Sequence, residues 1–257
     1  MSSQTAAPLE VLSAPPVHPG VRMALFLDLD GVLAPMADSP DAVVPDPRRT
    51  AVLQALDRRL DGRMAIVSGR TLIEIDRIAD GASRSAAGVH GLERRLRSGL
   101  IERPDASPAV AEVMARFLAF AGERPGVIVE DKGISAGLHY RQAPHAGSEA
   151  GALARRLADE TGLTLQAGHM VLELKTPGSD KGGAVAAFMS EPPFLGATPV
   201  MLGDDLTDEA GFIAARALGG FGVLVGPPRP TAASYGLADV PAVLDWLEAV
   251  AAMGDDQ

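Results

Sequence analysis

Short apolar runs alternate with longer amphipathic stretches through the first part of the chain. Residues 24–27 (Ala-Leu-Phe-Leu) and 64–67 (Met-Ala-Ile-Val) are continuously apolar, which is the pattern of strands buried on both faces of a parallel sheet. Helices are expected after them, near residues 48–60 and 71–79, and a further strand at 87–90. Alternating strands and helices predict an α/β domain with a parallel sheet.

The order of elements changes between residues 98 and 177. Two helices are each followed by a pair of strands, and the expected ranges are 108–122, 127–131, 134–141, 147–161, 163–167 and 170–175. Short links containing glycine join the strands of each pair, which predicts antiparallel hairpins. The earlier alternation resumes afterwards, with elements expected at 181–189, 199–202, 207–216, 221–225 and 240–251.

The chain is therefore expected to fold as two domains. Residues 21–97 and 178–257 form a Rossmann-like α/β core with a parallel sheet, and residues 98–177 form an inserted α+β cap, or lid. Residues 1–20, rich in Pro, Ser and Ala, are expected to be a flexible arm. The run at 219–226 lacks GxGxxG spacing and no GxxxxGK[ST] occurs, so neither a dinucleotide fingerprint nor a P-loop is indicated.

Composition narrows the class of partner. The 23 Lys and Arg against 33 Asp and Glu give a formal net charge of -10, which argues against nucleic acid or an anionic membrane surface. No apolar stretch reaches the roughly 18 to 20 residues of a membrane span, and residues 1–20 lack the pattern of a secretion signal. The absence of cysteine removes thiolate chemistry and is compatible with a cytoplasmic location. No pattern indicates the oligomeric state.

The first apolar strand ends in two carboxylates, Asp28 and Asp30, followed by Gly31. Open α/β sheets place their ligands at the carboxyl ends of strands, and glycine allows a tight turn that brings Asp30 back over the same site. An isolated Asp-X-Asp-Gly string also occurs as a solvated turn after a strand. The rest of the chain decides between these interpretations.

Two more strand ends carry residues suited to a phosphate and a cation. Residues 68–70 (Ser-Gly-Arg) offer a hydroxyl, an open backbone and a guanidinium, although Ser68 alone is also a common helix cap. Asp204 and Asp205 follow the strand at 199–202, where their mutual repulsion favours a bound cation. Acidic residues one turn later are explained by the helix dipole alone.

A lysine, Lys181, begins the helix expected at 181–189. The helix dipole opposes a positive charge there, so this lysine is more easily understood if it faces anions. Carboxylates, a lysine, a serine and glycine turns at successive strand ends together predict a site for Mg²⁺ and a phosphoryl group. With no cysteine and no Gly-X-Ser-X-Gly elbow, an aspartate is the natural nucleophile.

Four features in this order and spacing resemble the motifs of the haloacid dehalogenase (HAD) superfamily: DLDGVL (28–33), the strand ending in Ser68, Lys181, and GDDLTDE (203–209). Finer strings resemble the trehalose-6-phosphate phosphatases, namely VSGR (67–70), GVHGLE (88–93), EDKGIS (130–135), LHYR (138–141), VLELK (171–175) and GSDKG (178–182). The resemblance covers residues 24–225. It departs at Val32, where that family more often has threonine.

The resemblance implies a Mg²⁺-dependent phosphatase that hydrolyses trehalose 6-phosphate to trehalose and phosphate. Asp28 would attack phosphorus to form an aspartyl phosphate, while Asp30 acts first as an acid and then as a base. Ser68 and Lys181 would hold the phosphoryl oxygens. The metal ligands are expected among Asp28, Asp30 (through its carbonyl), Asp204, Asp205 and Asp208.

The cap should select the sugar. Glu130 and Lys132 lie two apart on a strand and share one face, and Glu173 comes from the neighbouring hairpin. Without the resemblance, an exposed Glu–Lys pair worth about 0.2 to 1 kcal/mol would explain the first two, and His90 would equally be a core histidine. With it, the residues expected to bind substrate are Gly69, Arg70, His90, Glu130, Lys132, Arg141 and Glu173.

Two other functions remain as alternatives. A related HAD phosphatase would act on sucrose phosphate or a mannosyl phosphoglycerate, and a substrate panel separates these. A non-catalytic sugar-phosphate-binding domain would have no need of an acid at position 30. The presence of Asp28, Asp30, Lys181 and Asp204 together therefore argues against the non-catalytic alternative.

Overall fold

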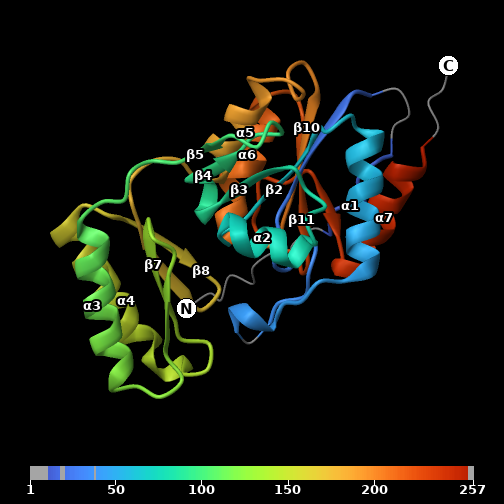
Figure 1. The fold of residues 1–257 in the computed structure, drawn as a ribbon. Helices are drawn as coiled ribbons and strands as arrows, with labels where there is room; N and C mark the ends of the chain where they lie inside the picture. Colours follow the sequence, from blue (N-terminus) through green and yellow to red (C-terminus); the bar gives the residue numbers. More distant parts are fainter. Residues whose placement is uncertain (1–10, 18–20, 38, 254–257) are drawn as a thin grey trace, which may run out of the picture.

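The computed structural model describes residues 11–17, 21–37 and 39–253, and within them the chain forms a larger and a smaller body (Figure 1). The larger body contains an eight-stranded sheet in the order β12-β11-β10-β1-β2-β3-β4-β5. Its strands are β1 (Met23–Leu27), β2 (Met64–Val67), β3 (Ser85–Gly88), β4 (Glu93–Arg95), β5 (Ile101–Glu102), β10 (Thr198–Gly203), β11 (Phe221–Val225) and β12 (Tyr235–Leu237). The strands from β12 to β3 are parallel, and β4 and β5 are antiparallel.

Helices cover both faces of this sheet. On one face lie α1 (Pro47–Arg59), α2 (Leu72–Ala79) and α7 (Val240–Ala252), and on the other lie α5 (Lys181–Met189) and α6 (Glu209–Ala217) (Figure 1). Strand β1 divides its apolar side chains between two cores: Leu25 and Leu27 face the first group of helices, while Phe26 packs against Phe188 and Phe194 on the other face. This confirms the α/β class and explains why the strand has no polar positions.

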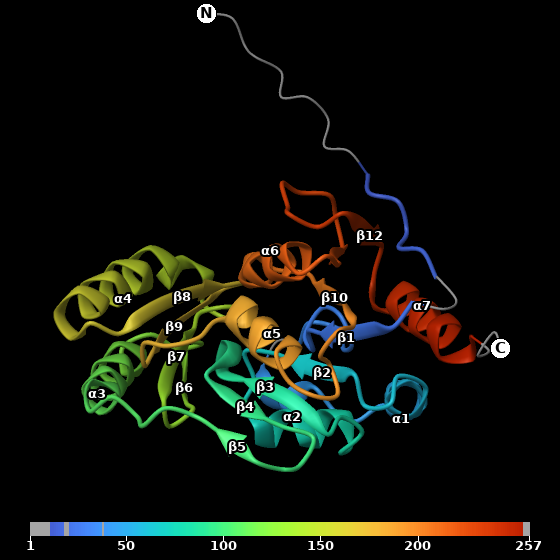
Figure 2. The same cartoon turned by 90° about the horizontal axis from the view of Figure 1, so that it is seen from above.

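The smaller body is the cap. Its antiparallel sheet has the order β6-β7-β9-β8, formed by β6 (Ile128–Asp131), β7 (Ser135–His139), β8 (Thr164–Gly168) and β9 (Val171–Lys175). Helices α3 (Ala109–Gly122) and α4 (Gly147–Thr161) pack on one face of that sheet, on the side away from the core domain (Figure 2). The opposite sheet face is left for the site, and the two-hairpin pattern read from the sequence is confirmed.

Two short connections join the bodies, and hydrogen bonds tie them together. The Ser107 amide donates to the hydroxyl of Thr176, which itself donates to the Ile134 carbonyl. Lys175 reaches from the end of β9 to the backbone carbonyl of Ser179, 3.0 Å away. The two connecting segments therefore lie side by side at one edge of the cap.

Some expectations about strands require correction. The strand expected at 87–90 is β3 and ends at Gly88, because Val89 and His90 adopt left-handed backbone conformations (φ 47° and 55°) that cannot continue a strand. Strands β4, β5 and β12 were not expected at all. Residues 101–102, assigned to the cap from the sequence, pair with β4 in the larger sheet, so the cap begins after them.

The flexible arm expected at 1–20 is wrong for residues 11–17. The Pro15 carbonyl accepts a hydrogen bond from the Trp246 indole at 3.0 Å, and the Ser13 carbonyl accepts one from the Gly236 amide. Leu12 and Val17 pack against the two faces of the core. Residues 1–10 and 18–20 lie outside the described residues. Across the described part of the chain, no helix is both long enough and apolar enough to cross a membrane.

Candidate active site

Three neighbouring strands bring the predicted catalytic residues to one edge of the sheet. Strand β1 lies between β10 and β2, and the residues that follow these strands are Asp28, Asp204 and Ser68. Asp28 and Ser68 are buried, with 5% and 1% of their surface exposed. The carboxyl ends of the parallel strands therefore gather these residues, which the sequence placed together by the same argument.

Lys181 supplies the central positive charge of the site. Its Nζ atom lies 2.9 Å from Oδ2 of Asp28 and 2.6 Å from Oδ1 of Asp208. Burial by itself lowers the pKa of Lys181, but the negative charges of Asp208 and Asp28 outweigh burial, so the pKa is raised and the ammonium stays charged. The expectation that this lysine faces anions is confirmed in geometry.

Asp208 anchors the acidic loop after β10. It is fully buried, and its Oδ2 atom accepts the backbone amides of Asp204 and Asp205, each at 3.0 Å. Gly203 makes room for it, since a Cβ atom at Gly203 would lie 2.2 Å from Cγ of Asp208. Both carboxylate oxygens of Asp208 are thus engaged, one by Lys181 and one by the loop backbone.

The carboxylates of Asp28, Asp204 and Asp208 form one cluster, with an oxygen from each lying within 4.8 Å of the others. Burial raises the pKa of Asp28 well above its usual range, and burial together with the charge of Asp208 raises the pKa of Asp204 to about 7. Crowded, desolvated carboxylates of this kind are stabilised by a cation. An all-oxygen donor set suits Mg²⁺, so the residues present fit that ion.

Asp205 is placed differently from its neighbours. One of its oxygens accepts the Leu206 amide at 2.6 Å, and the other accepts the His169 amide of the cap at 3.1 Å. Its carboxylate is not part of the three-carboxylate cluster that the described residues form. The structure therefore brings together three of the predicted metal-binding side chains and turns Asp205 towards the cap.

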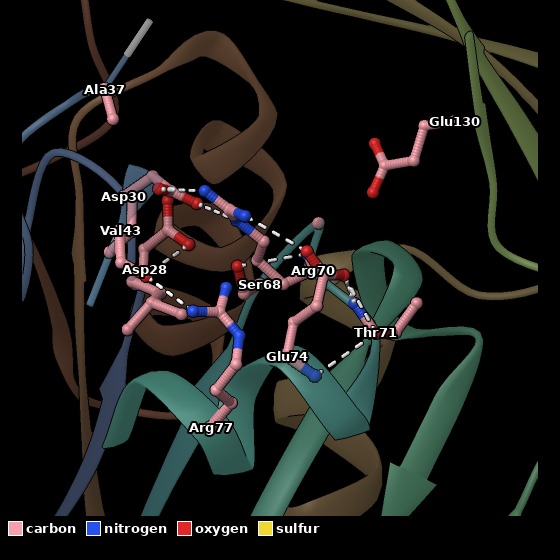
Figure 3. A network of polar contacts seen from close by, with 12 residues as sticks. Asp28, Asp30, Ala37, Val43, Ser68, Arg70, Thr71, Glu74, Arg77 and Glu130 are labelled. Carbon is pink, nitrogen blue, oxygen red and sulfur yellow. Dashed lines mark hydrogen bonds and ion pairs between the residues drawn. The ribbon is translucent and has the colours of Figure 1, made fainter. Parts of the chain in front are cut away.

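Asp30 is held by Arg70 (Figure 3). The guanidinium donates from Nε to one Asp30 oxygen and from Nη2 to the other, both at 2.8 Å. Gly31, with φ of 80°, turns the chain after Asp30 and approaches so closely that a Cβ atom there would lie 2.1 Å from Asp204. The sequence grouped Arg70 with the substrate, whereas the structure shows its guanidinium on the predicted acid/base.

The residues after β2 also support the site. The hydroxyl of Ser68 accepts the Arg70 amide at 3.2 Å. Gly69 lies against the ring of His90, where a Cβ atom would approach within 2.7 Å, and its carbonyl accepts a hydrogen bond from Lys132 of the cap at 2.8 Å. The His90 ring thus leaves no room for a side chain at Gly69, and the Lys132 hydrogen bond ties the cap to the backbone of the same residue.

A buried ionic group forms the ceiling of the site. Lys132 lies 2.6 Å from Glu173 and 3.6 Å from Glu130. Gly137 lies between these two glutamates in the sheet register, so no side chain separates them. Burial raises the pKa of Glu173, but the charges of Lys132 and His90 lower it by a larger amount, so the pKa lies below its usual range.

His90 joins this group from the core. Its Nε2 atom lies 3.5 Å from Glu173, and burial lowers the pKa of the imidazole. Among the described residues, Nδ1 of His90 and Oε1 of Glu173 are buried without a hydrogen-bond partner. Buried polar atoms without partners are costly, so two such atoms beside a pocket indicate a place for a polar ligand.

Arg141 extends the contact between the two domains. Its guanidinium donates to the backbone carbonyl of Ala37 in the core and, at 3.3 Å, to that of His169. A single pocket is lined from below by the core residues and from above by Glu130, Lys132, Arg141 and Glu173. All the predicted substrate-binding residues line this pocket.

Two residues of the site were not predicted. His139 pairs with Glu130 at 2.7 Å and lines the pocket, although it carried only a weak signal as part of LHYR. Glu74 contacts Arg70 at 3.0 Å, but in the sequence it has only the spacing of a helix-capping residue. The first could be found from the alternation of β7; the second required the structure.

Solved structures share this architecture. The C-terminal domain of trehalose-6-phosphate phosphatase from C. albicans aligns with a TM-score of 0.79 at 22% identity, over 90% of this chain and 92% of that one. A protein described as related to trehalose-6-phosphate phosphatase aligns with a TM-score of 0.74 at 25% identity, over 89% and 96% of the two chains. The chain therefore has the same class of fold as these solved structures, an α/β core domain with an inserted cap.

Sequence relatives narrow this class further. The trehalose-phosphatase family model matches residues 26–241. Trehalose-6-phosphate phosphatase of Escherichia coli strain K12 is 42% identical over 233 residues, which cover 89% of this chain and 86% of that protein. A probable trehalose-phosphate phosphatase of Sinorhizobium fredii is 39% identical, over 85% and 82% of the two chains. The chain belongs to the trehalose-phosphatase family.

Proposed function

We propose that this protein is a Mg²⁺-dependent phosphatase that hydrolyses trehalose 6-phosphate to trehalose and phosphate through an aspartyl-phosphate intermediate at Asp28. The observation that carries the proposal is the buried Asp28 carboxylate, 2.9 Å from the Lys181 ammonium, beneath a cap that offers paired acid and base groups to a sugar. The relatives named above are described as phosphatases of the same ester.

The side chains of Asp28 and Asp30 would carry out the reaction in two steps. An oxygen of Asp28 forms a bond to phosphorus as the bond from phosphorus to the sugar oxygen breaks, and the proton of Asp30 passes to that oxygen. Asp30 then takes a proton from a water molecule, whose oxygen bonds to phosphorus as the bond to Asp28 breaks. Lys181 and Ser68 face the phosphoryl oxygens, and the Lys181 charge opposes their repulsion by Asp28.

Mg²⁺ would be held by the carboxylates of Asp28 and Asp204, with the Asp30 carbonyl as a further ligand, while Asp208 acts from behind through the loop backbone and Lys181. When bound, the ion supplies positive charge that neutralises the phosphoryl group and orients it. Asp205 is placed by its hydrogen bond to His169 to act on the cap instead.

The cap residues would recognise the sugar hydroxyls. The partnerless buried atoms of Glu173 and His90 need a hydrogen-bonding ligand, and Lys132 and Glu130 lie beside them. A site built to hydrogen-bond hydroxyl groups rejects analogues that lack them strongly, because its polar atoms are then left unpaired. Arg141 would complete the wall where the cap meets the core.

Phosphate release from trehalose 6-phosphate, with and without EDTA, tests the proposal. We expect turnover that EDTA abolishes and added Mg²⁺ restores, and Asp28→Asn is expected to lose it. Retained turnover in Asp28→Asn would refute the nucleophile. A higher kcat/KM for sucrose phosphate or a mannosyl phosphoglycerate would replace the substrate, and binding without release of phosphate would indicate the non-catalytic alternative.

We also infer a cytoplasmic location, for which the cysteine-free sequence is the support. Immunoblotting of cell fractions tests it: recovery in the soluble cytoplasmic fraction is expected, and recovery outside that fraction would contradict it.

A further inference from the structure

The guanidinium of Arg70 donates a hydrogen bond to each oxygen of Asp30, and so it fixes the plane of that carboxylate. About 10% of the Arg70 side chain is exposed, and the Asp30 side chain is 26% exposed and lines the pocket. Two parallel charge-assisted hydrogen bonds fix orientation as well as distance. The direction from which Asp30 meets the sugar oxygen therefore depends on where Arg70 is held.

Glu74 holds the other side of the same guanidinium (Figure 3). Its Oε1 atom accepts from Nη1 of Arg70 at 3.0 Å. Its Oε2 atom accepts the amide of Thr71 at 3.0 Å and the hydroxyl of Thr71 at 2.8 Å. The carboxylate is thus fixed at the first turn of α2 by one oxygen and contacts Arg70 with the other.

This division of labour requires a carboxylate. A glutamine has one oxygen and one amide nitrogen in the same place, so it can cap the helix or accept from Arg70, but it cannot do both. With the oxygen on the cap, the amide hydrogens face the guanidinium and repel it. The helix cap alone would be satisfied by glutamine, which also occurs in capping boxes.

We propose that Glu74 is a positioning residue for the phosphatase reaction, which acts by holding Arg70 so that Arg70 orients the acid/base Asp30. The inference rests on the proposed function for the role of Asp30. Arg70 then supports the acid Asp30, and the first turn of α2 contributes to the reaction as well as to stability.

The leaving group provides the test. A sugar oxygen leaves as a strongly basic alkoxide unless it receives the proton of Asp30, whereas a nitrophenolate is weakly basic and needs little protonation. The measured quantity is kcat/KM, which covers binding and cleavage of the ester bond and leaves out the later hydrolysis of the aspartyl phosphate. Wild type and Glu74→Gln are compared on trehalose 6-phosphate and on p-nitrophenyl phosphate.

We expect Glu74→Gln to lower kcat/KM for the sugar ester about tenfold, part of the 10²- to 10⁴-fold that a positioned acid supplies. The loss should fall mainly on kcat, and kcat/KM for the aryl ester should change by less than about twofold. Arg70→Lys keeps the charge but loses the two-pronged grip, and it is expected to show the same dependence on the ester. If Glu74→Gln fails to fold, kcat/KM for the two esters is compared between wild type and Arg70→Lys instead.

The matched control lies on the same helix. Asp76 pairs with both terminal nitrogens of Arg95, at 2.6 and 2.7 Å, away from the pocket. Asp76→Asn breaks an ion pair of the same kind and is expected to leave both kcat/KM values unchanged. Equal losses on both esters in Glu74→Gln, or no loss beyond that of Asp76→Asn, would overturn the proposal.

The two proposals fail separately. If the wild-type protein hydrolyses a different sugar phosphate, the substrate in the proposed function is wrong, and the comparison is made with that sugar ester instead. If trehalose 6-phosphate is the substrate and Glu74→Gln shows no dependence on the leaving group, only the positioning role is lost.

Discussion

The Nζ atom of Lys132, in the cap, lies 2.8 Å from the backbone carbonyl oxygen of Gly69, in the core. The same atom lies 2.6 Å from Glu173, beside His90 of the core. One ammonium thus connects the ceiling of the pocket to the loop that carries Ser68 and Arg70. The sugar recognition that we propose and the seating of the cap would therefore depend on the same side chain.

Replacement of Lys132 by methionine is expected to weaken substrate binding and to destabilise the fold. Lys132→Met leaves the buried Glu173 carboxylate without its cation, and removing one partner of a buried pair typically costs about 3–5 kcal/mol. We expect KM for trehalose 6-phosphate to rise at least tenfold and the urea midpoint to fall. Arg156→Met, which breaks an exposed ion pair on α4, should change neither; an unchanged KM in Lys132→Met would contradict the role in recognition.

Magnesium is expected to stabilise the fold through the Asp28–Asp204–Asp208 cluster. At 100 times its Kd, a ligand of the native state adds about 2.7 kcal/mol to the free energy of unfolding, which raises Tm. Asp204→Asn should abolish this shift. It should also make the metal-free protein more stable at neutral pH, since it removes a carboxylate whose pKa is raised to about 7 by burial and by Asp208.

Calorimetric scans with EDTA and with Mg²⁺ measure both effects. A Tm shift that persists in Asp204→Asn would place the ion elsewhere. A metal-free Asp204→Asn protein that melts below the metal-free wild type would contradict the repulsion among the three carboxylates.

Alanine at Gly203 is expected to damage the site from within. The new Cβ atom would lie 2.2 Å from Cγ of Asp208, so the acidic loop or Lys181 must move, and overpacking of this kind costs about 1–3 kcal/mol. The urea midpoint of unfolding and the Mg²⁺-dependent activity should both decline. Gly122→Ala, at the end of α3 where a Cβ atom meets open space, is the matched control and should lower neither, since alanine is favoured over glycine in a helix.

Acid is expected to weaken the fold through Glu173 and His90. The pKa of Glu173 is lowered below 4.5, so the stability it contributes is present above that pH and is lost as the pH falls. The pKa of His90 is lowered by burial below 6.5, so the unfolded chain takes up that proton first and unfolding is favoured as the pH falls through 6.5. The contribution of His90 to stability should therefore decline from pH 7.5 to pH 5.5, while Asp204, whose pKa is raised to about 7, contributes in the opposite direction.

The free energy of unfolding of wild type and His90→Asn, measured in urea at both pH values, separates this contribution. As the pH falls from 7.5 to 5.5, wild type should lose stability relative to His90→Asn, whereas His145→Asn, at an exposed position, should change with pH as wild type does. An equal pH dependence in wild type and His90→Asn would contradict the assignment to His90.

The sequence predicted the fold well where strands are continuous apolar runs. Strands β1, β2 and β11 have no polar residues, and β10 has only Thr198 at its first position, so their pattern is unambiguous. It failed for β4, whose residues are Glu93, Arg94 and Arg95, because two antiparallel neighbours and ion pairs hold this strand in place of apolar periodicity. Tertiary pairing of that kind leaves no local signal.

The site was predictable as a set of residues but only partly in its detail. Strand ends and spacing placed Asp28, Ser68, Lys181 and Asp204 together. The roles of Asp205 and Asp208 could not be separated, because they lie within one turn and the choice depends on which side chain packs against Gly203. Glu74 was hidden because its spacing is already explained by a helix cap.

The hydrogen bond from the His169 amide to Asp205 joins the tip of the β8–β9 hairpin to the loop that bears Asp204. Because this hydrogen bond spans the two domains, any movement of the cap away from the core would break it, so the seating of the cap is linked to the conformation of the acidic loop.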